Sequence, residues 1–273
     1  MRTILICACA TLVATACNKP DPVTTTPEPE VEAPPEPDPA AEEGGEDAGE
    51  DAGGDDAGAA EGGEEPPPEP VDQRTLQTKA CEEEGRAEIC TSLAVMWAQG
   101  KEGPQDDAKA RGYFQTACDG GHDLACFNLA VYLDQGIGGE PDAAKAVELY
   151  TTICEAEGAD QAEACFNVAV MADAGKGGDP DKAKARVQYQ KACDGGHQVG
   201  CTSVGRMAML GEGGKKNAKA ARTLFTAACD AGELGGCYML SLALSKGLGG
   251  KKNKKKAKEM KAKACDGGYQ PAC

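Results

Sequence analysis

The chain has 273 residues and a formal net charge of −17, but this charge is unevenly distributed. Residues 18–72 carry 19 acidic residues against one lysine, whereas residues 73–273 carry 26 acidic and 26 basic residues. The acidity therefore belongs to one segment, and the neutral remainder lacks the basic excess expected of a nucleic-acid-binding protein.

The first 16 residues have the form of a targeting sequence. Arg2 provides a positive start, and the apolar run over residues 4–16 is too short to span a bilayer. Residues 13–17, Val-Ala-Thr-Ala-Cys, resemble the box of bacterial lipoproteins, in which small residues precede a cysteine that becomes lipidated. This resemblance implies a signal peptide over residues 1–16, a lipid anchor on Cys17 and, through Asn18, the outer membrane. Simple secretion is the alternative.

The next segment has the composition of a linker. Residues 18–72 contain no aromatic residue and 12 of the chain's 16 prolines. Such a segment cannot bury enough apolar surface to offset the entropy lost on ordering. We therefore expect residues 17–71 to form a disordered acidic linker with an r.m.s. span of about 40 Å. A binding site for a basic partner is the alternative.

Residues 72–273 contain a repeating pattern of cysteine pairs. The first cysteines of successive pairs are 36 to 39 residues apart, and the two cysteines of one pair are 8 to 11 apart. Self-similarity at this period is typical of a solenoid built from small structural repeats. The twelve cysteines are Cys81, Cys90, Cys118, Cys126, Cys154, Cys165, Cys193, Cys201, Cys229, Cys237, Cys265 and Cys273.

Each repeat has the pattern of a helical hairpin. Leu or Val stands three places after the second cysteine, and glycine stands ten places after it, as in a helix of about three turns with a glycine cap. A second helix then leads to the next cysteine, with alanine eight places before it and an aromatic residue four places before it in most repeats. Residues 72–81 form a half-repeat with a single helix. No segment alternates with period two, so we predict an all-α fold.

The segments Ala117–Gly121, Cys126–Tyr132 and Ala143–Ala146 resemble the Sel-one-like repeat (SLR), a relative of the tetratricopeptide repeat. Cysteines eight apart are most similar to those of the secreted, cysteine-rich bacterial SLR proteins of the Hcp type. The resemblance covers residues 72–273 and implies a right-handed superhelical solenoid of about five helical-hairpin repeats of 36 residues. Its concave face would bind a protein or peptide. By the same resemblance, Asn128 and Asn167 would contact the peptide backbone; the alternative is a polar residue on a half-exposed helix face.

The cysteines and histidines fit structural roles. In an exported protein an even set of regularly spaced cysteines indicates disulfides in an oxidising compartment, whereas a metal site needs C-x-x-C or histidine clusters. We expect each pair to close within its own unit, although other pairings are formally possible. His122 and His197 occupy a place that holds Glu233 and Tyr269 in other repeats, so we expect exposed turn residues. No metal and no cofactor is expected.

The last repeat is rich in lysine. Residues 251–263 contain eight lysines and one glutamate, and Lys261 stands where four earlier repeats have an aromatic residue. A terminal helix has no following repeat to cover it, so a polar capping face is the expected explanation. Binding to an acidic partner, to lipid head groups or to the acidic segment of the chain is the alternative. Met96, Tyr132, Met171 and Met207 share one place in the first helix and are expected in the core.

These patterns favour a lipid-anchored scaffold for protein or peptide binding in the bacterial cell envelope, with no nucleic-acid partner. A structural spacer without a ligand is one alternative. The other is a β-lactamase-like or penicillin-binding hydrolase, because some cysteine-rich SLR proteins have been described in this way. Serine β-lactamases need S-x-x-K, and none of Ser92, Ser203, Ser241 and Ser245 has a lysine three places on. Enzymatic activity therefore rests on family analogy alone.

Overall fold

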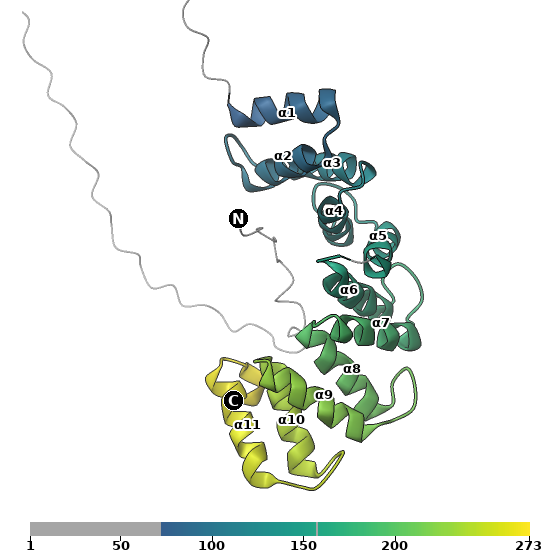
Figure 1. Ribbon diagram of the computed structural model, residues 1–273, viewed down its shortest axis with the longest axis vertical. Helices are drawn as coiled ribbons and strands as arrows, with labels where there is room; N and C mark the ends of the chain where they lie inside the picture. Colours follow the sequence, from purple (N-terminus) through teal and green to yellow (C-terminus); the bar gives the residue numbers. More distant parts are fainter. Residues whose placement is uncertain (1–71, 157) are drawn as a thin grey trace, which may run out of the picture. The chain divides into compact units, whose positions relative to one another are not determined.

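The computed structural model describes residues 72–156 and 158–273 (Figure 1). The expected signal peptide, the lipidation site Cys17 and the linker lie outside these residues. The described residues form eleven α-helices and one short 3-10 helix, with no strand among them. The elements are α1 (Gln73–Glu84), α2 (Ala87–Gln99), α3 (Asp107–Asp119), α4 (Asp123–Gln135), α5 (Ala143–Glu155), α6 (Gln161–Ala174), α7 (Lys182–Asp194), α8 (Gln198–Leu210), α9 (Ala218–Asp230), α10 (Leu234–Lys246), α11 (Lys254–Asp266) and η1 (Gln270–Ala272).

The helices form an array of hairpins that follow the order of the chain. We call α2, α4, α6, α8 and α10 the A helices and α3, α5, α7, α9 and α11 the B helices. Each A helix packs on the B helix that follows it, and each B helix packs on the next A helix (Figure 1). Helix α1 precedes the first A helix and takes the part of a B helix, as the half-repeat predicts. The prediction of an all-α solenoid is confirmed.

Local sequence determines where these helices begin and end. Every A helix ends at a glycine in the left-handed region, with φ between 65° and 84°, where a side chain would be strained. Every B helix is preceded by Asp or Asn, whose side-chain oxygen accepts a hydrogen bond from a backbone N–H of the first turn at 2.8 to 3.0 Å. The capping residues are Asp106, Asp142, Asp181, Asn217 and Asn253.

The core lies between the A and B helices. The alanine eight places before the first cysteine of a pair and the aromatic residue four places before it are buried in the first four B helices. In the last B helix only the alanine, Ala257, is present and buried. Met96, Tyr132, Met171 and Met207 are buried too, so the prediction that they belong to the core is confirmed. The helices approach so closely that a Cβ at Gly205 would lie 2.7 Å from the Phe225 ring. A small residue is therefore required at this crossing.

The last helix ends the core. Only Ala257 and Ala264 of α11 are buried, and Lys261 is exposed where the other B helices bury an aromatic ring. None of the helices in the described residues is long and apolar enough to cross a membrane.

Candidate functional site

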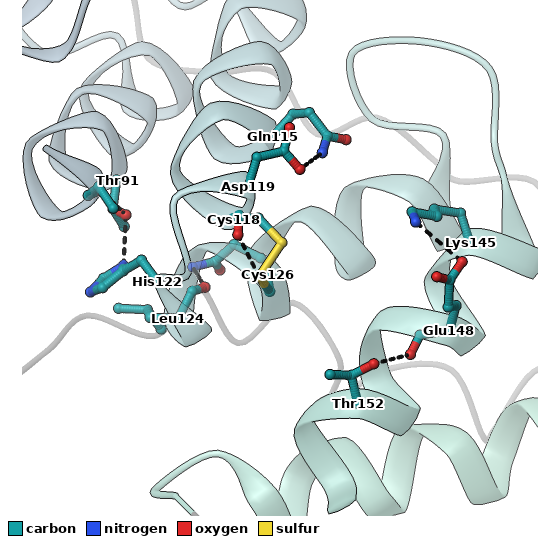
Figure 2. Close-up of a disulfide and its surroundings, with 12 residues drawn as sticks. Thr91, Gln115, Cys118, Asp119, His122, Leu124, Cys126, Lys145, Glu148 and Thr152 are labelled. Carbon is teal, nitrogen blue, oxygen red and sulfur yellow. Dashed lines mark hydrogen bonds and ion pairs between the residues drawn. A yellow bond between two sulfur atoms is a disulfide. The ribbon is translucent and has the colours of Figure 1, made fainter. Parts of the chain in front are cut away.

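Six disulfides lie along the array, with Cα atoms 4.4 to 5.0 Å apart. Five of them link the C-terminal turn of α1 or of a B helix to the first turns of the following A helix, and so join successive repeats. Figure 2 shows the bond between Cys118 and Cys126, which joins α3 to α4. The last bond, Cys265–Cys273, joins α11 to η1. Because every A–B hairpin closes without a disulfide, the bonds restrain how neighbouring repeats stack.

The histidines are not the exposed turn residues expected from the sequence. His122 lies at the start of α4 and is half-buried, with Nδ1 2.7 Å from Oγ1 of Thr91 in the preceding repeat (Figure 2). The Thr91 hydroxyl donates its hydrogen to the Ala87 carbonyl, so His122 Nδ1 must be the donor to Thr91. The imidazole therefore connects two repeats.

His197 makes the equivalent contact through a different pairing. Its ring stacks on Phe166 of the preceding repeat with centroids 4.2 Å apart, and its side chain is only 16% exposed. Its Nδ1 accepts from the Gly200 N–H, which leaves Nε2 as the donor to Glu163 at 2.9 Å. The expectation of an exposed residue fails because the turn of one repeat packs on the A helix of the repeat before it.

Glu233 and Tyr269 take the place of the histidines in the last two repeats, and they also contact the A helix of the preceding repeat. The Thr202 hydroxyl donates to Glu233 at 2.6 Å, and the rings of Tyr238 and Tyr269 lie 5.7 Å apart. A threonine in the A helix therefore meets a hydrogen-bonding residue, and an aromatic residue meets another ring. These pairs hold the repeats in register.

Small polar side chains stand on four of the five A helices, two places after the second cysteine of the repeat. Asn128 is half-buried, and its Nδ2 donates to the Leu124 carbonyl at 2.9 Å in its own helix. Asn167 is also half-buried, and its amide has no hydrogen-bond partner among the described residues. The equivalent residues are Ser92, Ser203 and Met239.

A line of apolar side chains lies one helical turn further along the A helices, five places after the second cysteine of each repeat. The sequence shows this regular spacing, but these residues were not predicted as part of a site. Val170 is the most exposed of its apolar members, at 37%, and Arg206 interrupts the line. Its other members are Val95, Val131 and Leu242. In the Arg206 repeat, Val199 and Leu210 are 46% and 58% exposed on the same A helix.

Arg206 is held in this line by carboxylates. Its guanidinium lies 2.9 Å from Glu212 and 3.6 Å from Asp173 of the preceding A helix. Asp173 also pairs with Lys182, and Asp134 pairs with Lys176 at 2.9 Å. The arginine is only partly exposed and firmly oriented, so the A-helix face combines amide, apolar and cationic groups.

A second set of residues missed by the sequence analysis is a series of arginines seven places before the first cysteine. Arg111 donates to the Glu140 carbonyl at 2.8 Å, and Arg222 donates to the Lys251 carbonyl at 3.0 Å. Arg186 donates to the carbonyls of Glu212 and Lys215, and Arg74 donates to several carbonyls of residues 96–104. Each arginine therefore binds the A–B loop of the following repeat. Val147 takes this place in α5.

The described residues contain no cluster of three or more His, Cys, Asp or Glu side chains able to hold a metal ion. A hollow of about 540 Å³ lies beside the Cys154–Cys165 disulfide and is lined by Glu155, Gln161, Lys191 and Asp194 as well. Its lining contains no serine and no free thiol that could act as a nucleophile. The A-helix face is therefore the better candidate site.

Comparisons with known proteins agree with this architecture. The sequence model of the Sel1 repeat matches five segments, residues 90–122, 123–157, 162–197, 199–233 and 235–269. A comparison with curated protein sequences gives no match.

Two solved structures with TM-scores above 0.5 show the same fold. The crystal structure of c5321, a protective antigen of uropathogenic Escherichia coli strains that displays an SLR fold, is 24% identical over 73% of this chain, with a TM-score of 0.68. The chain spans only 42% of the length of that protein. A Sel1 repeat protein from Oxalobacter formigenes is 18% identical over 73% of this chain and 79% of its own, with a TM-score of 0.64. Cysteine-rich protein B (hcpB) of Helicobacter pylori is 26% identical over 48% of this chain and 92% of its own, with a TM-score of 0.38.

Proposed function

Because the chain belongs to the Sel1 repeat family, we propose that it is a lipid-anchored, disulfide-stapled scaffold that binds a protein or peptide at the bacterial cell envelope. Sel1 repeat scaffolds typically mediate protein–protein interactions. Six disulfides indicate an oxidising setting, extracellular or periplasmic. The anchor on Cys17, the outer-membrane location and the linker over residues 17–71 are parts of this proposal.

The A-helix face is the proposed binding surface, as the concave face of the solenoid. The observation that carries this proposal is the half-exposed amide of Asn167, which has no hydrogen-bond partner in the described residues. Asn128 and Asn167 stand at equivalent places in successive repeats, so the two amides could hydrogen-bond to the backbone of one extended peptide at two points.

The apolar line explains how such a peptide would be held between those points. Successive side chains of an extended peptide point to opposite sides, so alternate residues would face the A helices, where Val170 is exposed. Arg206 lies in the next repeat, and its guanidinium already pairs with Glu212 and Asp173. The proposed ligand is therefore an extended peptide with apolar residues.

Affinity capture from an envelope extract tests the binding surface. The oxidised protein is compared with the variant Asn128→Ala/Asn167→Ala and with the matched control Gln115→Ala/Gln190→Ala, which removes one half-buried and one exposed amide from the B helices α3 and α7. We expect a partner retained by the protein and by the control, and reduced at least tenfold with the asparagine variant. Equal retention by all three proteins would contradict binding on this face.

A separate experiment tests the anchor. Cells are labelled with a clickable palmitate analogue, and the protein is compared with its Cys17→Ala variant. Label on the protein and none on the variant is the expected result, together with accumulation of the precursor in globomycin. A mature protein without label, processed normally in globomycin, would instead indicate simple secretion.

The two alternatives to a scaffold have their own readouts. Nitrocefin hydrolysis by the purified protein would support the β-lactamase-like hydrolase, for which the residues described above offer no nucleophile with a neighbouring lysine. Capture of no partner under any condition would support a structural spacer.

A further inference from the structure

The folded repeats are electrically asymmetric although their total charge is zero. Residues 73–204 carry 21 acidic and 12 basic residues, whereas residues 205–273 carry 5 acidic and 14 basic residues. The C-terminal third is therefore strongly positive. The excess of lysine begins before α11, so a polar cap on the terminal helix does not account for it.

The charge changes sign at equivalent positions of the A–B loops. The loops before α5 and α7 read Glu140-Pro141-Asp142 and Asp179-Pro180-Asp181. At the same positions the loops before α9 and α11 read Lys215-Lys216-Asn217 and Lys251-Lys252-Asn253. Each loop thus changes from two negative charges to two positive charges.

The fold does not require this change. Asn217 accepts from the Ala220 N–H at 3.0 Å just as Asp142 accepts from the Lys145 N–H at 2.9 Å. The Lys215 carbonyl receives Arg186, as the Glu140 carbonyl receives Arg111. The loop architecture is therefore the same with either set of side chains.

The lysines also oppose the local electrostatics of the fold. Helix α11 begins with Lys254, Lys255 and Lys256, and a cation at a helix N-terminus is disfavoured by the helix dipole by about 0.3 to 1 kcal/mol. Several lysines of the central repeats have ion-pair partners, such as Lys145 with Glu148 and Lys182 with Asp173. In the described residues no lysine of the last two loops and the helix starts that follow them forms an ion pair.

These lysines form one continuous exposed surface. The loop before α11 packs on the start of α9, because a Cβ at Gly249 would lie only 2.1 Å from the Ala218 carbonyl oxygen. The two loops are therefore neighbours. We define the lysine edge as Lys215, Lys216, Lys219, Lys251, Lys252, Lys254, Lys255 and Lys256, all of them exposed.

We propose that the lysine edge binds the anionic head groups of a phospholipid surface. Clusters of four to eight basic residues are typical of proteins that bind anionic lipids. Lysine offers a hydrated point charge without the bidentate geometry of arginine, which suits mobile head groups better than one fixed carboxylate. The inference rests on the proposed function in one respect, since an anchor on Cys17 would keep this surface near a membrane.

Two other partners fit the surface less well. Stacking on nucleobases requires aromatic side chains, and the lysine edge contains none. A second copy of the chain would offer the acidic loops of its first repeats, where Asp106, Asp142 and Asp181 already direct their carboxylates to helix N-termini.

Vesicle co-sedimentation tests the proposal. The oxidised mature chain carries Cys17→Ser, so that it cannot be acylated, and is mixed with vesicles of phosphatidylcholine alone or of phosphatidylcholine with phosphatidylglycerol. We expect binding only to the vesicles with phosphatidylglycerol, and a marked loss of binding in high salt. At about 1 kcal/mol per lysine near an anionic surface, each lysine removed should weaken binding about fivefold.

The chain itself supplies the variant and its control. Replacing both loops by the sequence of the loop before α5 gives Lys215→Glu, Lys216→Pro and Asn217→Asp with Lys251→Glu, Lys252→Pro and Asn253→Asp. Proline is compatible here, because the N–H groups of Lys216 and Lys252 donate no hydrogen bond within the described residues. The control replaces the same four lysines by arginine and keeps the charge. We expect at least 100-fold weaker binding for the loop variant and near-normal binding for the control.

Each remaining outcome overturns the proposal. Equal binding to both kinds of vesicle, or unchanged binding by a loop variant with a normal melting temperature, would exclude the lysine edge as a lipid site. Loop-dependent binding to polyglutamate without binding to vesicles would assign the surface to an acidic protein. Loop-dependent dimerisation without vesicle binding would assign it to a second copy. Since the chain carries no acyl group and no Asn128 or Asn167 substitution, these failures are distinct from failure of the anchor or of the peptide site.

Discussion

Where a B helix carries this arginine, the arginine and a glycine in the following A–B loop form a pair whose energetic coupling can be measured. A Cβ built at Gly214 would lie 2.9 Å from Nη1 of Arg186, whereas a Cβ at the equivalent Gly178 meets nothing within 4 Å. The difference arises because Val147 takes the arginine's place in α5. Neither glycine has a positive φ, so alanine is conformationally acceptable at both.

Gly178→Ala and Gly214→Ala should therefore change stability in opposite directions. Alanine at Gly178 reduces the conformational entropy of the unfolded chain and should stabilise by about 0.4 to 1 kcal/mol. Alanine at Gly214 gains the same amount but displaces Arg186 from its bonds to the Glu212 and Lys215 carbonyls at 3.3 and 3.1 Å. At about 1 to 1.5 kcal/mol for each of these partly exposed bonds, the net result is a loss of about 1 to 2 kcal/mol.

Urea unfolding of the oxidised protein, followed by circular dichroism, measures these changes. The decisive comparison is a double-mutant cycle in which Gly214→Ala is also made in an Arg186→Val background that copies Val147. There the alanine should stabilise, as at Gly178, which corresponds to a coupling of about 2 kcal/mol. Equal effects of the two alanines, or an additive cycle, would refute the pairing of arginine with glycine.

Three further predictions concern other features of the array. Gly213→Ala should cost more than Gly214→Ala, at about 2 to 4 kcal/mol, because φ is +64° and the Cβ would lie 2.1 Å from the Lys182 carbonyl; a urea midpoint equal to that of Gly214→Ala would contradict this. Reduction of the six disulfides, each stabilising by up to roughly 2.6 kcal/mol, should lower the melting temperature sharply, and unchanged melting in strong reductant is the opposing result. Burial first, and then nearby Asp107 and Asp173 respectively, raises the pKa of Tyr132 and of Tyr189 to about 12. Since the unfolded chain loses these protons near pH 10, stability should fall as the pH rises from about 10 to about 12. Ultraviolet titration of the native protein should show Tyr132 and Tyr189 ionising late, rather than all six tyrosines ionising together near pH 10.

Much of the local structure could be predicted from the sequence. The glycine ten places after the second cysteine marks the end of every A helix, because only a residue without a Cβ adopts the left-handed cap without strain. The alanine and aromatic columns mark the buried side of the B helices, because helical periodicity places them on one face. Both signals lie within one repeat, so a single copy suffices to read them and the others repeat the observation.

The residues of the candidate site could be predicted less completely from the sequence. It identified Asn128 and Asn167 but missed the neighbouring line with Val170 and Arg206. That line also recurs once per repeat, but its residue types do not indicate a function, because valine on a helix is as common in a core as on a binding face. The exposure of Val170 and the burial of Val131 became apparent only when each side chain could be placed against the neighbouring repeat.

Contacts between repeats were decided by the tertiary structure. Arg186 binds the carbonyl of Lys215, 29 residues later, and His122 contacts Thr91, 31 residues earlier. The repeat length says that equivalent residues recur, but it does not say by how much one hairpin is offset against the next. That offset is set by how alanine, aromatic and glycine positions interlock when two helix pairs are packed together. The sequence by itself therefore determined the repeating unit and its helix ends, and only the packing of one unit on the next determined which side chains meet.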